Sequence, residues 1–414
     1  MSSGLRFLGY LFCAYFFQKG AALSLLELTM LPLFQNVLGC SSSTYQKLKT
    51  VVYSPFSFKP LIAVLSDARP ILKYRKRYYI IGAAAVGGTA MIVMATSLDV
   101  LGANSVALLA FACVLSASVT DILSEGRYSQ FIREDKSGTA SKLVVFVWVC
   151  IFVARFIASA ITGPIADMGG SAMLLFASAI LTLQIVVPLI CGWMPEEETE
   201  GWQVIPPNLT YLGTIVVLGT LTVVLAAVGG VLWVQLLAGT FVAGCVYASS
   251  RTLLGSQNPK IHRTNMYLFL VAAMSLDSSP LEYYYTSSTC GIGLSYTTYV
   301  SYCGMASSVA AAAGAMLVQK CASTWSYRTL FVFATVCKCV GGLVDVALVS
   351  GWVAKSRVKL LFVLGDCIFV SICCHSKLDG TAFARPRKSN VLRCCTSSTL
   401  THPTAYPLQA PPDR

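Results

Sequence analysis

Long apolar runs, separated by short polar links, follow one another along most of the chain. A helix that crosses a lipid bilayer needs roughly 20 mostly apolar residues. The runs predict helices over 7–34, 45–66, 77–98, 103–123, 143–163, 171–193, 209–227, 230–249, 264–284, 294–318, 328–350 and 358–375. The pattern therefore predicts an all-α polytopic membrane protein.

A repeated stretch divides these helices into groups. The run YRKRYYIIGAAAVGG, which starts at Tyr74, is similar to YRTLFVFATVCKCVGG, which starts at Tyr327. Two related halves of this kind are a feature of transporter folds. The predicted parts are an N-terminal six-helix half (1–193), an acidic cytoplasmic link (194–208), an inserted helix pair (209–249), a second half with four recognisable helices (264–384) and a disordered polar tail (385–414).

Composition and charge support the membrane prediction. The chain is 56% hydrophobic and 12% charged, whereas soluble domains have roughly 25% charged residues. The formal net charge is +12, but Lys and Arg gather in alternate links, and only 351–357 departs from this pattern. Such a bias places the N-terminus and the tail in the cytoplasm. We expect a multi-pass protein of the plasma membrane, in contact with lipid and not with nucleic acid.

The chain has no motif of a known enzyme class. It contains no G-x-x-x-x-G-K-[ST], H-E-x-x-H or G-x-S-x-G sequence, which are typical of phosphate binding, metalloproteases and hydrolases. Most of the 16 cysteines lie inside apolar runs, without metal-ligand spacing to the histidines. We therefore expect no enzyme activity, no metal and no cofactor.

Ionisable residues inside the predicted spans are the candidate functional groups. A charge at the centre of a membrane helix costs roughly 2.5–3.5 kcal/mol, so it usually pairs inside the bundle or lines a water-filled path. The candidates are Lys19, Glu27, Asp121, Arg155, Lys338 and Asp366, and further ionisable residues are Lys59, Glu125, Asp277, Glu282 and Asp345. Lys59, Asp121 and Asp366 lie near helix ends, where snorkelling or loop contacts are the alternative.

Three aromatic residues and a basic loop complete the candidates. Tyr283, Tyr284 and Tyr285 form either an interfacial belt or a stacking surface for a planar heterocycle. Asp67 is followed by a cation-rich link that includes Arg75, Lys76 and Arg77. This link is either a topology signal or a cytoplasmic latch, since it resembles the loop between the second and third helices of major facilitator transporters.

Several stretches resemble the folate–biopterin transporter family of the major facilitator superfamily. They are SPFSFKPLIAVLSDARPILKYRKRYY, VTDILSEGRYSQFIRE, GPIADMGG, NMYLFLVAAMSLDSSPLEYYYT, SYTTYVSY, YRTLFVFATVCK and VLGDCI. The resemblance implies a major facilitator fold with six, two inserted and six helices, so we expect this chain to be C-terminally truncated relative to the family. It also implies proton-coupled uptake of folate, biopterin or related pteridines. S-adenosylmethionine uptake and a transport-inactive paralogue are the alternatives.

The resemblance also assigns roles to the candidates. Lys19 and Arg155 are expected to neutralise an anionic folate tail, or to pair with Glu27 and Asp121 when no substrate is bound. Glu27 or Asp121 would accept the coupled proton, and the tyrosines at 283–285 would stack on the pterin ring.

Overall fold

The computed structural model describes most of the first half of the chain and parts of the second. The described residues are 3–134, 140–199, 213–214, 216–222, 224–225, 232–254, 262–263, 266, 279–288, 291–321, 327–350, 363–365 and 368.

Helices make up almost all of the described structure. In the first half they are α1 (Ser3–Phe12), the π-helical η1 (Cys13–Ala22), α2 (Leu23–Pro32), the π-helical η2 (Leu33–Val37), α3 (Ser42–Tyr53), the 3-10 helix η3 (Ser54–Phe58), α4 (Lys59–Ala68), α5 (Arg77–Ser97), α6 (Ala103–Glu134), α7 (Ala140–Asp167), α8 (Ser171–Leu183) and α9 (Val186–Ile190). The later helices are α11 (Leu232–Ser249), the π-helical η4 (Ser250–Leu254), α13 (Ser279–Thr286), the π-helical η5 (Thr297–Cys303), α14 (Gly304–Cys321) and α15 (Tyr327–Val349).

The predicted spans agree with these helices in type, and the class of fold is confirmed. Five described helices, Gly4–Val37, Arg77–Ser97, Ala103–Ile132, Leu143–Asp167 and Ser171–Ile190, are long and apolar enough to cross a membrane. The predicted end of the fourth span at residue 123 is wrong, because α6 continues through charged residues to Glu134. The helix therefore extends beyond the apolar run that predicted it. Most of the predicted spans 264–284 and 358–375 lies outside the described residues, and 209–227 is described in part.

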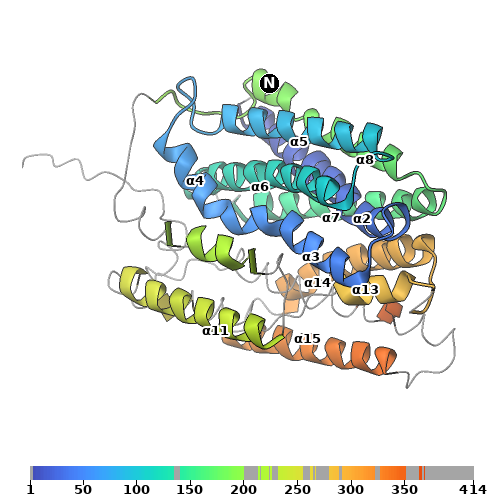
Figure 1. Cartoon of the computed structure of the whole chain (residues 1–414). Helices are drawn as coiled ribbons and strands as arrows, with labels where there is room; N and C mark the ends of the chain where they lie inside the picture. The colour runs from blue at the N-terminus through green and yellow to red at the C-terminus, as the bar shows by residue number, and fades with distance from the viewer. Residues whose placement is uncertain are drawn as a thin grey trace, which may run out of the picture.

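The first half forms a helical bundle (Figure 1). Helix α5 packs against α6 and α8, and α7 packs against η1, α2 and α8. Phe34, Tyr45, Met94 and Leu175 are buried in the largest core cluster. In contrast, α8 leaves Met173 and Ile180 66% and 56% exposed on its outer face. Apolar side chains on the outside of a tightly packed bundle are what a lipid environment requires.

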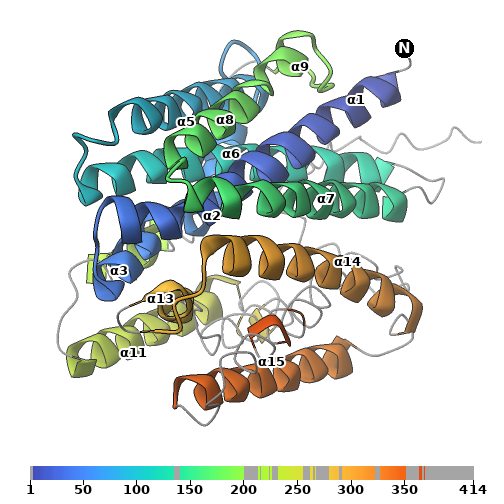
Figure 2. The ribbon, with the colours of Figure 1, turned by 90° about the vertical axis from the view of Figure 1, so that its right-hand side faces the viewer.

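The two parts of the chain meet along α7, with α14 running beside it (Figure 2). Helix α7 packs against both η5 and α14, and α3 packs against α13. A Cβ atom on Gly163 of α7 would lie 2.6 Å from the Tyr296 carbonyl oxygen and 2.7 Å from Thr297 Cα. The backbone N–H of Gly163 instead donates to Ser301 Oγ at 3.1 Å. Glycine is therefore required for this backbone-to-backbone contact.

Candidate functional site

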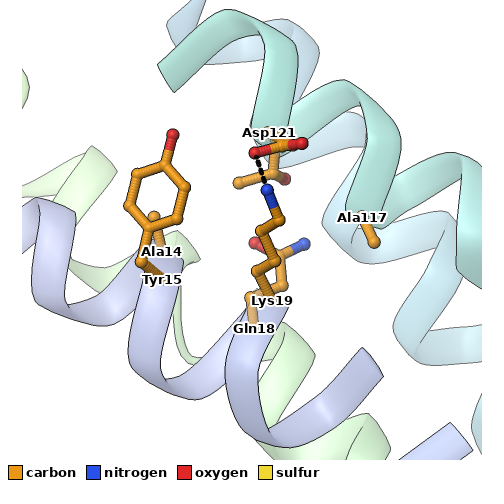
Figure 3. A pocket seen from close by; sticks show the side chains of 7 residues that line it. Ala14, Tyr15, Gln18, Lys19, Ala117 and Asp121 are labelled. Carbon is orange, nitrogen blue, oxygen red and sulfur yellow. Dashed lines mark hydrogen bonds and ion pairs between the residues drawn. The ribbon is translucent and has the colours of Figure 1, made fainter. Parts of the chain in front are cut away.

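Asp121 lies at the centre of a buried ion cluster. Its side chain is 3% exposed, and Lys19 Nζ lies 2.7 Å from Oδ1 while Lys59 Nζ lies 2.5 Å from Oδ2. Figure 3 shows Lys19 pointing from η1 to Asp121 on α6. The 3-10 turn η3 brings Lys59 to this position, since Ser118 Oγ on α6 donates to the Pro55 carbonyl oxygen at 3.1 Å. One carboxylate thus holds three separate helical segments together.

A small pocket adjoins this cluster. It is lined by Ala14, Tyr15, Gln18, Lys19, Ala117, Thr120 and Asp121, and in this conformation it has no room for a water molecule. A ligand can therefore enter only if the side chains that line the pocket move apart.

Glu27 and Arg155 form a second ion pair farther along the first helix. Arg155 Nη1 donates to Glu27 Oε2 at 3.1 Å, and Nη2 donates to Oε1 at 3.4 Å. This two-point geometry is the strongest arrangement for a guanidinium and a carboxylate. Glu27 is eight residues beyond Lys19, about 12 Å along the helix at a rise of 1.5 Å per residue. The side chains of Glu27 and Arg155 are 34% and 39% exposed, so this pair is more accessible than Asp121.

A third ion pair connects the two parts of the chain. Lys49 Nζ on α3 lies 2.7 Å from Glu282 Oε2 on α13, and Tyr45 Oη donates to the same oxygen at 3.3 Å. Glu282 is one of the ionisable residues within the predicted spans, whereas Lys49 is not among the sequence-based candidates. The available signal was that Tyr45 and Lys49 lie four residues apart, on one face of a helix.

Further polar contacts join the two parts at the same end of the bundle. Gln35 Oε1 accepts hydrogen bonds from Thr286 Oγ1 at 2.8 Å and Tyr296 Oη at 2.9 Å. The Asp167 carboxylate accepts from the backbone N–H groups of Tyr296 at 2.9 Å and Thr297 at 2.8 Å. On the predicted topology these residues lie at the non-cytoplasmic ends of their helices. The described contacts therefore join the two parts of the chain at this end of the bundle.

The three consecutive tyrosines of α13 have different neighbours. Tyr283 Oη donates to the Cys40 carbonyl oxygen at 3.0 Å, whereas Tyr285 is 3% exposed and packs with Cys303. The Tyr284 and Tyr285 rings meet edge to face, with centroids 6.1 Å apart. The three rings thus do not form one flat surface, and stacking on a substrate stays a prediction.

The basic loop has a partner that the sequence analysis missed. Glu196 caps α5, because its Oε1 accepts the Lys76 backbone N–H at 2.7 Å and its Oε2 accepts that of Arg77 at 3.1 Å. A carboxylate is favoured at a helix N-terminus. Lys73 Nζ also lies 3.6 Å from Glu198 Oε2. The opposite charges of the acidic link 194–208 and the cation-rich link after Asp67 are the sequence signal for this contact.

Asp67 lies near the end of α4 and Lys76 lies just before α5, both beyond the predicted end of the second span. Burial raises the pKa of Asp67, while the nearby Lys76 and Arg75 lower it to a smaller extent. Burial likewise lowers the pKa of Lys76, whose side chain passes over Gly126 of α6. The loop is thus packed onto the ends of its neighbouring helices, as a latch would be, and a latch function stays a prediction.

The remaining candidates are only partly described. Lys338 lies in α15, and its side chain is not among those that the structure describes, while Asp366 lies outside the described residues. Among the described residues, no group of three His, Cys, Asp or Glu side chains is placed to hold a metal ion.

The family follows from residues 19–378, which match the model of the BT1 family. This chain belongs to the BT1 family. No curated protein sequence matches the BT1 chain at a significant level.

Solved structures show its fold. The POT family transporter PepTSo superposes with a TM-score of 0.68 at 11% identity, over 94% of this chain and 85% of that chain. A POT family transporter in complex with 5-aminolevulinic acid gives 0.63 at 12% identity, over 90% and 82%. The nucleoside transporter NupG gives 0.54 at 11% identity, over 96% and 85%. The BT1 chain is therefore a multi-pass membrane protein with a major facilitator-like fold.

Proposed function

We propose that this BT1-family protein is a secondary transporter that moves a folate, biopterin or related pteridine across the membrane together with protons. The observation that carries the proposal is the series of ion pairs inside the bundle, at Asp121, at Glu27 and at Glu282. Charges are rarely placed inside a membrane protein unless they serve a substrate or ion pathway. The major facilitator-like fold supports transport, and the sequence resemblance supports a pteridine.

The geometry supports Glu27 over Asp121 as the proton-coupling carboxylate. Protonation of Glu27 has to release one cation, Arg155, from a pair that is about one-third exposed. Protonation of Asp121 has to release Lys19 and Lys59 from a carboxylate that is 3% exposed. Once Glu27 is protonated, Arg155 is available for an anionic group of the substrate. The proton and the substrate would thus reach the same ion pair in sequence.

Uptake into vesicles containing the purified full-length protein tests the proposal. With an inward proton gradient, labelled biopterin or folate is expected to accumulate above its external concentration, and a protonophore is expected to abolish the accumulation. Glu27→Gln should remove the gradient dependence and retain exchange of internal for external substrate. Lys47→Met, on the neighbouring helix α3, is the control.

Other outcomes would replace the proposal. Pteridine uptake without gradient dependence would remove proton coupling. Uptake of S-adenosylmethionine alone would change the substrate class. No uptake of any of these compounds, by a protein that unfolds cooperatively, would identify a transport-inactive paralogue.

A further inference from the structure

Three polar atoms in the pocket beside Asp121 have no hydrogen-bond partner in the described part of the chain. They are Tyr15 Oη, Gln18 Oε1 and Thr120 Oγ1. Their residues are 2%, 2% and 3% exposed, and all three line the same pocket. The Tyr15 hydroxyl lies near Tyr128 but outside hydrogen-bond geometry. Buried polar atoms are normally paired, so their gathering around one pocket points to a missing polar partner.

The charges in this pocket are already paired. Both Asp121 oxygens are engaged by lysines, and Lys19 is one of them. Gln18 Nε2 also has a partner, since it donates to Ser116 Oγ at 3.3 Å. What remains is one carbonyl acceptor and two hydroxyls. A carbonyl oxygen needs an N–H or O–H group, and the hydroxyls can donate to a carbonyl oxygen or a ring nitrogen.

We propose that this pocket binds the neutral, amide-like edge of the transported heterocycle, where an N–H or amino group lies next to a carbonyl group. This inference rests on the proposed function and adds the orientation of the substrate. Gln18 Oε1 accepts from the ring N–H, and the Thr120 and Tyr15 hydroxyls donate to the carbonyl oxygen.

The distance to Arg155 supports this orientation. The Glu27–Arg155 pair lies about 12 Å along the helix from Lys19. An elongated substrate can therefore place a neutral ring in the pocket and an anionic group at Arg155. The pocket is closed in this conformation and has no room for a water molecule, so the side chains that line it have to move apart when the ring enters. This differs from the sequence-based expectation that Lys19 neutralises the tail, because Lys19 is already paired with Asp121.

Thr120→Val and Tyr15→Phe remove only unpaired hydroxyl groups and test the inference. Both substitutions keep the shape of the side chain approximately. Removing an unpaired buried group does not destabilise the ligand-free protein, so its unfolding temperature should stay the same or rise. Biopterin affinity should fall by about two- to tenfold in each variant, as expected for one lost hydrogen bond.

Thr29→Val is the matched control, because Thr29 Oγ1 is also buried and unpaired but lies outside the pocket. It should leave biopterin affinity unchanged. p-Aminobenzoylglutamate has the anionic end of folate without the pterin ring. Its affinity should fall in Arg155→Met and stay unchanged in Thr120→Val.

Two results would overturn the inference. Unchanged biopterin affinity in both pocket variants would mean that these hydroxyls do not contact the substrate, and biopterin transport by the wild type would then leave the proposed function intact. A wild type that binds neither biopterin nor p-aminobenzoylglutamate would overturn both proposals.

Discussion

Lys49 Nζ lies 2.7 Å from Glu282 Oε2, although 233 residues separate the two in the sequence. The pair connects α3 of the first half to α13, at the end of the bundle where Gln35 and Asp167 also bridge to later helices. Alternating access in transporters of this type rests on two halves that rock around a central site. If the proposed function holds, Lys49 and Glu282 belong to the contacts that break when this end of the bundle opens.

Removal of the cation should loosen this side. Lys49→Met leaves Glu282, 23% exposed, without its charged partner, and a hydrogen bond to a charged group contributes about 1.5–3 kcal/mol. The open state should gain roughly tenfold or more in population. The measurement is the rate at which a membrane-impermeant maleimide labels the buried Cys40, followed by mass spectrometry. Lys47→Met on the same helix is the control, and equal rates in both variants would contradict the prediction.

The Asp121 cluster should respond asymmetrically to substitution. Asp121→Asn leaves two lysines unpaired, and breaking a buried pair costs about 3–5 kcal/mol. Lys19→Met and Lys59→Met each leave one pair intact and should cost less. Because both lysines share one carboxylate, their effects should not add, with a coupling of about 0.5–3 kcal/mol. Thermal unfolding of the single and double variants measures this coupling. If Lys59→Met leaves the unfolding temperature unchanged, Lys59 does not contribute to the stability of the cluster.

The cap on α5 should contribute to stability. Glu196→Ala removes the acceptor of two backbone N–H groups and should cost about 1 kcal/mol, as loss of an N-cap does. Glu197→Ala is the matched control, because that neighbouring side chain is exposed. Unfolding midpoints in detergent give the comparison. Equal midpoints would mean that the acidic segment does not stabilise the loop.

Stability should depend on pH through Asp67. Burial raises the pKa of this carboxyl above its ordinary value of 3.8, so the folded state takes up a proton more readily than the unfolded state. The cost of the buried charge is fully present above the folded-state pKa and disappears as the pH falls through it. Wild type should therefore gain stability relative to Asp67→Asn as the pH falls from 7 toward 4. The exposed Asp99→Asn is the control, and a difference that grows with rising pH would contradict the sign.

The helices were predictable from the sequence because lipid imposes a simple rule on it. Apolar runs of sufficient length predicted α5, α7 and the combined segment of α8 and α9 within a few residues. The partners of the charged residues were less accessible, since they depend on how helices rotate against one another. Lys59 pairs with Asp121 only because η3 redirects the chain between α3 and α4. Glu196 caps α5 across 120 residues of sequence, a contact that no local pattern specifies.

The glycine contact at residue 163 has a mechanical consequence. The backbones of α7 and η5 are in contact there, so the two helices cannot come closer together. Their separation would break the hydrogen bond from Gly163 N–H to Ser301 Oγ. The contact can therefore serve as a fulcrum. Asp167 lies about 6 Å from it along α7, and Arg155 lies about 12 Å away in the opposite direction. A small tilt of α7 about Gly163 would move Asp167 and Arg155 in opposite directions. Release of Asp167 and rearrangement at Arg155 would then be parts of the same motion of the helix.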